Sequence, residues 1–161
     1  MPLRSADDMT GTQVARLGLS NAAAATIDRL LLIVSTIDDD RRPPAGLARD
    51  ALDALRTMNK VVARAVMTEM MRGTADEDLA DVFDMDPFTF VRQYGHLNAG
   101  HLADDPRAMW EQLRPTCPAA IHDTCPDDPA AAAHHLDEWM HRHLDPREAA
   151  PPPPHPVSAG L

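Results

Sequence analysis

Aromatic residues and lysine are scarce in this sequence. Phe, Tyr and Trp together make up 4% of its 161 residues, and Lys60 is the single lysine beside fourteen arginines. A core with so few rings must be built from Ala, Leu, Val and Met, which favours helices over a sheet. The length suits one domain with a hydrophobic core of its own. We therefore expect an all-α fold.

The sequence also lacks a long hydrophobic run and a signal peptide. Its most apolar stretch, Leu30–Val34, is too short to span a bilayer, and no apolar segment follows the first ten residues. We expect a cytoplasmic protein that does not enter a membrane. Cys117 and Cys125 are its two cysteines, and in that compartment they would be reduced thiols.

Catalytic motifs are absent as well. There is no Gly-rich phosphate loop, no G-x-S-x-G and no H-E-x-x-H. We therefore assign no catalytic residue and no cofactor, and we do not expect an enzyme. The formal net charge of −10 argues further against generic attraction to nucleic acid or to an anionic membrane.

The first helix is expected after a flexible N-terminus. Residues 1–18 mix Ser, Asp, Arg, Gly and Thr without a period, which is typical of a mobile segment. The helix should begin near Ser20 or Asn21, both good N-caps, and run through Ile37. It is apolar nearly all round at Leu30–Val34, which predicts burial inside the domain or in a homodimer.

The second and longest helix is expected from Ala45 to Arg72, with Gly73 ending it. Seven apolar residues fall on one face at helical spacing, and four basic residues line the opposite face. The apolar residues are Leu47, Leu52, Leu55, Met58, Val62, Val66 and Met70. The basic residues are Arg49, Arg56, Lys60 and Arg64. This basic stripe could hold the phosphates of a nucleic acid, or it could be a solvated face that pairs with acids of the same chain.

Asp-Pro pairs mark two helices in the second half. Asp105-Pro106 and Asp128-Pro129 each combine an N-cap with a proline suited to the first helical turn. Residues 145–161 contain four consecutive prolines and should form a disordered tail. We expect one compact domain of about six helices, from residue 19 to residue 144. The packing side of the last helix should hold Leu136, Trp139, Met140 and Leu144.

Cysteine and histidine residues gather in the last third of the chain. They are Cys117, His122, Cys125, His134, His135, His141 and His143. Zinc prefers these ligands, but C-x4-H-x2-C is not a standard spacing and no C-x2-C pair occurs. Three interpretations stay open: exposed histidines with two thiols, a disulfide in an oxidising compartment, or a structural zinc site. We assign no metal ligand.

The stretch Thr74–Gly95 is the part of the chain that points to a function. Thr74 and Glu77 fit the T-x-x-E capping box, so a helix should begin at Ala75. Its buried side should hold Leu79, Ala80, Val82 and Phe83.

A second short helix should follow at Pro87–Tyr94. Asp86 fits its N-cap, and Pro87 fits its first position. Gly95 stands where a left-handed residue would end it. The stretch is therefore predicted to be two helices joined by a three-residue turn.

This stretch resembles the helix-turn-helix of sigma-factor region 4 and of short actinobacterial regulators. Leu79-Ala80 matches the apolar and small pair at which the two helices cross, and Asp86 matches the cap of the second helix. Phe83 and Met85 match the apolar positions that flank the turn, and Phe90 matches the inward residue of the recognition helix. The resemblance covers 22 of the 161 residues and implies a DNA-binding role in transcription.

The stretch departs from that family in its turn and in its charge. Asp84 stands where the family has glycine, and Asp adopts a left-handed conformation less readily. Arg92 is the one cation between residues 74 and 95, so this surface alone should repel a duplex. Its six acids are Asp76, Glu77, Asp78, Asp81, Asp84 and Asp86.

Two functions follow from these patterns. The first is a small regulator of transcription, binding DNA directly or acting through the transcription machinery, with dimerisation through the first helix supplying a second half-site. In direct binding, Thr89, Arg92 and Gln93 would meet the major groove, while Arg49, Arg56, Lys60 and Arg64 would hold phosphates. The alternative is a non-enzymatic interaction module that presents the acidic face to a basic partner protein and no longer binds DNA.

Overall fold

The computed structural model describes residues 8–35, 43–113 and 128–143, and these residues form helices and no strand. The prediction of an all-α fold with about six helices is confirmed. The helices are α1 (Gly11–Ser35), α2 (Gly46–Met71), α3 (Asp76–Val82), α4 (Pro87–Tyr94), α5 (Pro106–Leu113) and α6 (Pro129–His143), with two 3-10 turns, η2 (Gly95–Leu97) and η3 (Gly100–Leu102).

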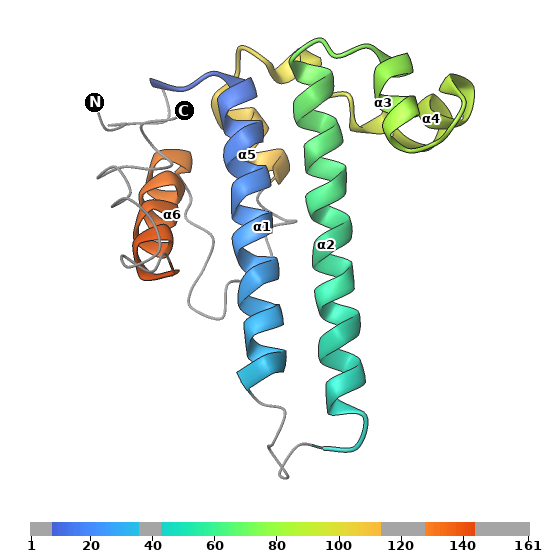
Figure 1. The fold of residues 1–161 in the computed structure, drawn as a ribbon. Coiled ribbons are helices and arrows are strands. Elements are labelled where there is room, and N and C mark those ends of the chain that lie inside the picture. Colours follow the sequence, from blue (N-terminus) through green and yellow to red (C-terminus); the bar gives the residue numbers. More distant parts are fainter. Residues whose placement is uncertain (1–7, 36–42, 114–127, 144–161) are drawn as a thin grey trace.

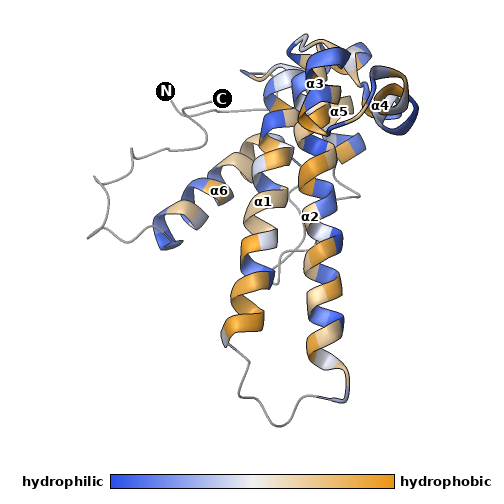
Figure 2. Ribbon diagram, turned by 45° about the vertical axis from the view of Figure 1, so that its right-hand side comes forward, coloured by the Kyte–Doolittle hydropathy of each residue, from blue (hydrophilic) through white to orange (hydrophobic). Residues whose placement is uncertain are grey.

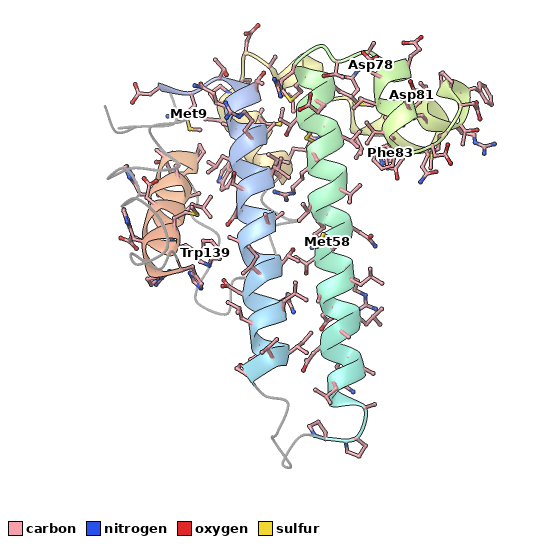
Figure 3. All side chains as sticks on the ribbon, in the orientation of Figure 1. Met9, Met58, Asp78, Asp81, Phe83 and Trp139 are labelled. Atoms are coloured by element: carbon pink, nitrogen blue, oxygen red, sulfur yellow. The ribbon has the colours of Figure 1, made fainter. Side chains whose placement is uncertain are left out.

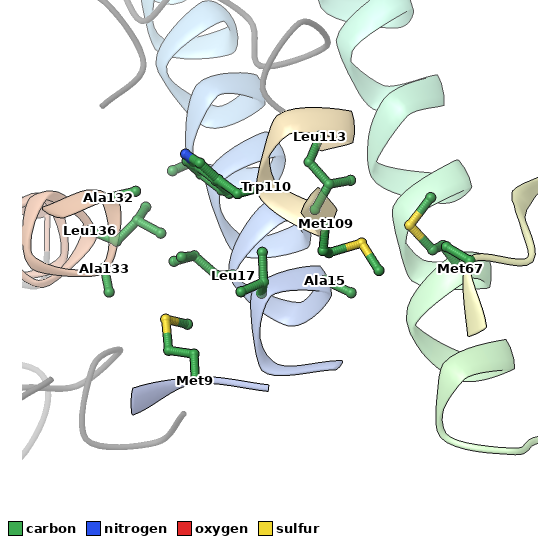
Figure 4. Packing of buried hydrophobic residues seen from close by; sticks show 13 residues of the cluster. Met9, Ala15, Leu17, Met67, Met109, Trp110, Leu113, Ala132, Ala133 and Leu136 are labelled. Atoms are coloured by element: carbon green, nitrogen blue, oxygen red, sulfur yellow. The ribbon is translucent and has the colours of Figure 1, made fainter. Parts of the chain in front are cut away.

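A long antiparallel pair, α1 and α2, forms the frame of the molecule. Figure 1 shows α5 and α6 beside the first half of α1, and α3 and α4 beside the C-terminal end of α2. The main core therefore lies at one end of the α1–α2 pair. Its largest fully buried side chains include Leu17 of α1 and Met109 and Trp110 of α5, with Ala133 and Leu136 of α6 against them (Figure 4).

Helix α1 begins about ten residues earlier than the sequence analysis predicts. The backbone N–H of Gln13 donates to Thr10 Oγ1 (3.3 Å), and the side-chain carbonyl of Gln13 accepts from the N–H of Thr10 (2.7 Å). This is a T-x-x-Q capping box, which satisfies two N–H groups that a helix start leaves free. The expectation of a flexible segment is thus wrong for residues 11–18, and residues 1–7 lie outside the described part.

Helix α2 has the predicted bounds to within one residue, and Gly73 follows it with a left-handed φ of 84°. Its predicted apolar face is only partly buried. Val66 and Met70 pack against α3 and α4, whereas four residues nearer the N-terminus are exposed. These are Leu47, Leu52, Leu55 and Met58. Most of the residues that α2 buries lie outside the predicted face, so the apolar periodicity did not identify the main packing face of this helix. They are Ala54, Thr57, Arg64, Met67 and Thr68.

The apolar end of α1 is exposed as well. Four residues of this run are 38–71% exposed, so its predicted burial within the domain is wrong for the described residues. They are Leu30, Leu31, Leu32 and Val34. Judged by length and composition, α1 could cross a membrane. Core helices of soluble proteins can be equally long and apolar, and 33% of the most apolar 18 residues of α1 is buried in the fold.

The Asp-Pro pairs place the remaining helix starts correctly. The N–H of Ala108 donates to Asp105 Oδ1 (2.9 Å) at the start of α5, and α6 begins at Pro129 as predicted. On α6, Leu136 is buried and Trp139 is half-buried, with its indole N–H donating to Asp28 Oδ1 of α1 (2.9 Å). The predicted contact of Leu144 and the Pro-rich segment 145–161 lie outside the described residues.

Candidate functional site

The candidate site is the unit of α3, α4 and the turn between them. Its start differs from the prediction, because the Thr74 hydroxyl donates to Glu69 Oε2 of α2 (2.8 Å). Ala75 is the N-cap of α3 and supplies no side-chain hydrogen bond. The prediction of a Thr74–Glu77 capping box is therefore wrong, because the Thr74 hydroxyl donates its hydrogen bond to a carboxylate in the last turn of α2.

The turn between α3 and α4 consists of residues 83–86, one residue more than the three-residue turn that was predicted. Asp84 adopts a left-handed φ of 52°, the conformation that the family usually gives to glycine. The N–H of Met85 donates to the carbonyl of Ala80 (3.0 Å), and Ala80 is fully buried where the two helices meet. An aspartate can adopt this conformation because its short polar side chain tolerates it better than most.

A ring cluster holds the unit together and anchors it to α2. The ring centroids of Phe83, Phe90 and Tyr94 lie 5.0–5.8 Å apart in tilted pairs. Phe90 is fully buried and packs with Leu79 of α3 and Val66 of α2. This confirms the inward role predicted for Phe90 and fixes the unit at the C-terminal end of α2.

The N-cap of α4 is Asp86, as predicted. Its Oδ1 accepts from the N–H of Thr89 (3.0 Å). Hydrogen bonds from the Thr89 side chain and then from the Thr89 backbone hold the pKa of Asp86 below its ordinary value, so this carboxylate stays ionised at neutral pH. Thr89 is half-buried and its backbone N–H serves the cap, and its contact with DNA stays a prediction.

Two expectations about the ends of this unit are wrong. Val82 is 79% exposed, although it was expected on the buried side of α3. Gly95 has a right-handed φ of −57° and continues into η2, so it does not end α4 in a left-handed conformation.

The outer face of α4 combines apolar and polar side chains. Phe88 is 75% exposed and Val91 is 46% exposed, and Arg92 and Gln93 beside them are exposed too. Phe88 is thus a ring outside the cluster of Phe83, Phe90 and Tyr94. An exposed ring next to an aliphatic side chain is a common anchor for a protein partner.

The rest of the surface of the unit is acidic. All six acids between residues 74 and 95 are exposed, and Figure 3 shows Asp78 and Asp81 on the outside of α3. Arg92 is the one cation in the same stretch. The unit therefore presents a strongly negative potential to solvent.

The basic stripe predicted on α2 does not join this unit. Arg64 is 3% exposed and donates from Nη1 to the carbonyl of Gly18 (2.7 Å) and from Nη2 to that of Leu113 (2.8 Å). A buried guanidinium that holds two backbone carbonyls cannot also reach a DNA phosphate. The prediction that Arg64 contacts DNA is therefore wrong.

The other basic residues of the stripe remain accessible and differ in their distance from α4, since Lys60 lines a pocket with Leu97 of η2, whereas Arg49 lies at the far end of α2. Arg56 pairs with Asp53 (2.9 Å), Arg49 is exposed, and Lys60 is half-exposed. Arg49 precedes Val66, the docking residue of the α3–α4 unit, by 17 positions, or about 26 Å along the helix axis. The structure thus does not bring the two predicted sets of DNA contacts onto one compact surface.

Metal ligands do not gather in the described part of the chain. No group of three or more His, Cys, Asp or Glu residues there could hold a metal ion. His134 lies 3.9 Å from Asp137, and His143 lies 3.5 Å from Asp28. Cys117, His122 and Cys125 lie outside the described residues.

Comparison of the chain with protein-family models, with curated proteins and with solved structures finds no match.

Proposed function

We propose that the chain is a non-enzymatic interaction module whose α3–α4 unit binds a basic partner protein. The observation that carries the proposal is the charge of this unit: six exposed carboxylates stand against one arginine. A partner rich in lysine or arginine would be attracted to this surface, whereas a phosphate backbone would be repelled.

The exposed apolar residues of α4 support the same function. Charge complementarity steers association and selects partners, while buried apolar anchors supply most of the affinity. Phe88 and Val91, three positions apart on α4, form one apolar ridge, and Arg92 and Gln93 are also exposed nearby. A partner helix with apolar and basic residues would fit both features.

A second candidate is direct DNA binding by a transcription regulator. It is supported by the shape of the unit, since Asp84 completes the turn in a left-handed conformation and Asp86 caps α4 as a recognition helix would be capped. Arg92 and Gln93 are exposed and would supply the base contacts. Its weakness is phosphate neutralisation, because Arg64 is buried and Arg49 lies far from α4.

Fluorescence anisotropy with two labelled probes separates the candidates. One probe is a pool of DNA duplexes, and the other is an amphipathic helical peptide rich in Arg and Leu. We expect the peptide to bind more weakly as salt rises, and the duplexes not to bind even at low salt. Replacing Asp78→Asn and Asp81→Asn together should weaken peptide binding about tenfold.

A matched variant controls for net charge. Glu111→Gln with Glu138→Gln removes the same two charges from α5 and α6, and it should leave peptide binding nearly unchanged. Equal losses in both double variants would contradict a site on α3. If the duplexes bind with a steep salt dependence and Arg92→Ala abolishes this binding, the proposed interaction module is contradicted and direct DNA binding by a regulator is supported.

A further inference from the structure

The end of the α1–α2 pair that lies away from the main core is covered with exposed apolar side chains. Nine large ones are between 38% and 71% exposed. They are Ile27, Leu30, Leu31, Leu32 and Val34 on α1, and Leu47, Leu52, Leu55 and Met58 on α2. We call these nine residues the apolar tip, and Figure 2 shows mostly orange at the lower end of α1 and orange mixed with white and blue at the lower end of α2.

The described part of the chain covers this face at one end and leaves it bare at the other. On α2, Val66 and Met70 belong to the same apolar stripe as Leu55, and they pack against α3 and α4. On α1, Val14 and Leu17 are fully buried in the main core. A helix that is apolar around its whole circumference, as α1 is near Leu30, is usually buried on every side by other parts of a protein.

The size of the apolar tip matches half of a stable protein interface. Nine large apolar side chains that are each 38–71% exposed leave an apolar area of the same order as the roughly 800 Å² per partner in an interface of standard size.

The charge near the tip permits contact between identical copies. Each copy carries a formal charge of −10, most strongly concentrated on α3 and α4, so copies repel each other over much of their surface. Among the described residues of α1 and α2, the charged ones beside the tip are nearly balanced, four basic and three acidic. They are Asp28, Arg29, Arg49, Asp50, Asp53, Arg56 and Lys60.

We propose that two copies of this chain associate through the apolar tip, and that the two α1–α2 pairs form a four-helix bundle. An isologous contact of this kind closes with the second copy, because each tip covers the other. A bilayer is a poorer occupant, since insertion of the pair would bury the charges of α2 along with its leucines. The balanced charges would instead stay at the wet rim of the protein interface. The proposal goes beyond the function proposed for α3 and α4 and does not depend on it.

Sedimentation velocity of the full chain from 1 to 100 μM tests the proposal. We expect a dimer that dissociates on dilution. Leu55, 57% exposed, is the clearest position to change. Leu55→Lys should raise the dimer dissociation constant roughly 100-fold, because each interface would then hold two lysines in apolar surroundings. The circular dichroism of the variant should stay that of the parent, since the change is on the surface of the monomer.

Val82→Lys is the matched control, because Val82 is at least as exposed but lies on α3. It should leave the dissociation constant unchanged. A chain that stays monomeric at 100 μM overturns the proposal. So does a dimer that Val82→Lys dissociates and Leu55→Lys does not. A monomeric chain could instead float with vesicles of neutral and anionic phospholipid. If Leu55→Lys abolished that flotation, the apolar tip would be a membrane-binding surface, and the proposal of a dimer would be overturned.

Discussion

Arg64 connects three helices although it is a cation in the interior. Its guanidinium bonds the carbonyl of Gly18 within α1 and that of Leu113 at the end of α5. The last carbonyls of a helix have no partner within the helix, and a positive charge there is favourable. Gly18 makes the approach possible, since a Cβ at this position would lie 2.9 Å from Arg64 Nη1 and 2.8 Å from Leu113 Cδ1.

Replacing Arg64 should therefore destabilise the whole fold. We expect Arg64→Met, which keeps most of the volume, to lower the free energy of unfolding by roughly 2–4 kcal/mol, because the Leu113 carbonyl at the helix end loses its donor and the Gly18 carbonyl loses a charged one. Urea unfolding followed by circular dichroism measures the change. Arg56→Met is the control: its guanidinium is 66% exposed, and its surface ion pair with Asp53 contributes about 0.5 kcal/mol or less. Equal stability of the two variants would show that the bonds of Arg64 hold nothing together.

At the scale of the helices, the sequence predicted helix starts that depend on a cap within the same few residues. It did not predict starts at which a second side chain competes for the capping residue. Asp86-Pro87 and Asp105-Pro106 gave the right helix starts because a cap acts over three or four residues of one chain. Thr74 failed because Glu69, five positions earlier, binds its hydroxyl. The start of α1 was missed because the first residue after the Thr10 cap is Gly11, a poor helix former.

The candidate site was predictable in the same limited way. The two short helices within residues 74–95 and the inward Phe90 were predicted from the sequence, whereas the left-handed Asp84 stood there as a departure from the usual glycine. The burial of Arg64 was not, because it depends on Gly18 and Leu113, which lie 46 and 49 residues away. On α2 the apolar periodicity did not show that the face with Arg64 packs against α1 and α5, because that burial depends on residues far away in the chain.

Two glycines that end helices differently give a prediction at this scale. Gly73 has φ 84°, so Gly73→Ala should destabilise the fold by about 1 kcal/mol even though the space around it is open. Gly95 has φ −57° and ordinary contacts, so Gly95→Ala should be neutral or stabilise by up to about 0.5 kcal/mol. Thermal unfolding of both variants measures the difference. A loss at Gly95 as large as that at Gly73 would indicate a left-handed residue there.

At the scale of the whole molecule, the interior is divided into two clusters of unequal size. The main one joins α1, α2, α5 and α6 around Trp110. The smaller one joins α3 and α4 to α2 around Phe90. Leu97 of η2 packs against both. Helices of seven and eight residues are not stable alone, so the α3–α4 unit depends on the smaller cluster.

This division predicts that the α3–α4 unit can unfold while the rest of the fold persists. Phe90→Ala should remove roughly 3–5 kcal/mol from the packing of the unit, since Phe90 is fully buried there. Hydrogen exchange read by mass spectrometry should then show faster exchange in residues 76–94, with protection kept in α1 and α5, whose contacts around Trp110 are unchanged. Val91→Ala, on the exposed face of the same helix, is the control and should leave both regions protected. If Phe90→Ala instead speeds exchange equally in α1, α5 and α4, the coupling through Leu97 makes the two clusters one cooperative unit, and a partner that binds α4 would then stabilise the entire chain.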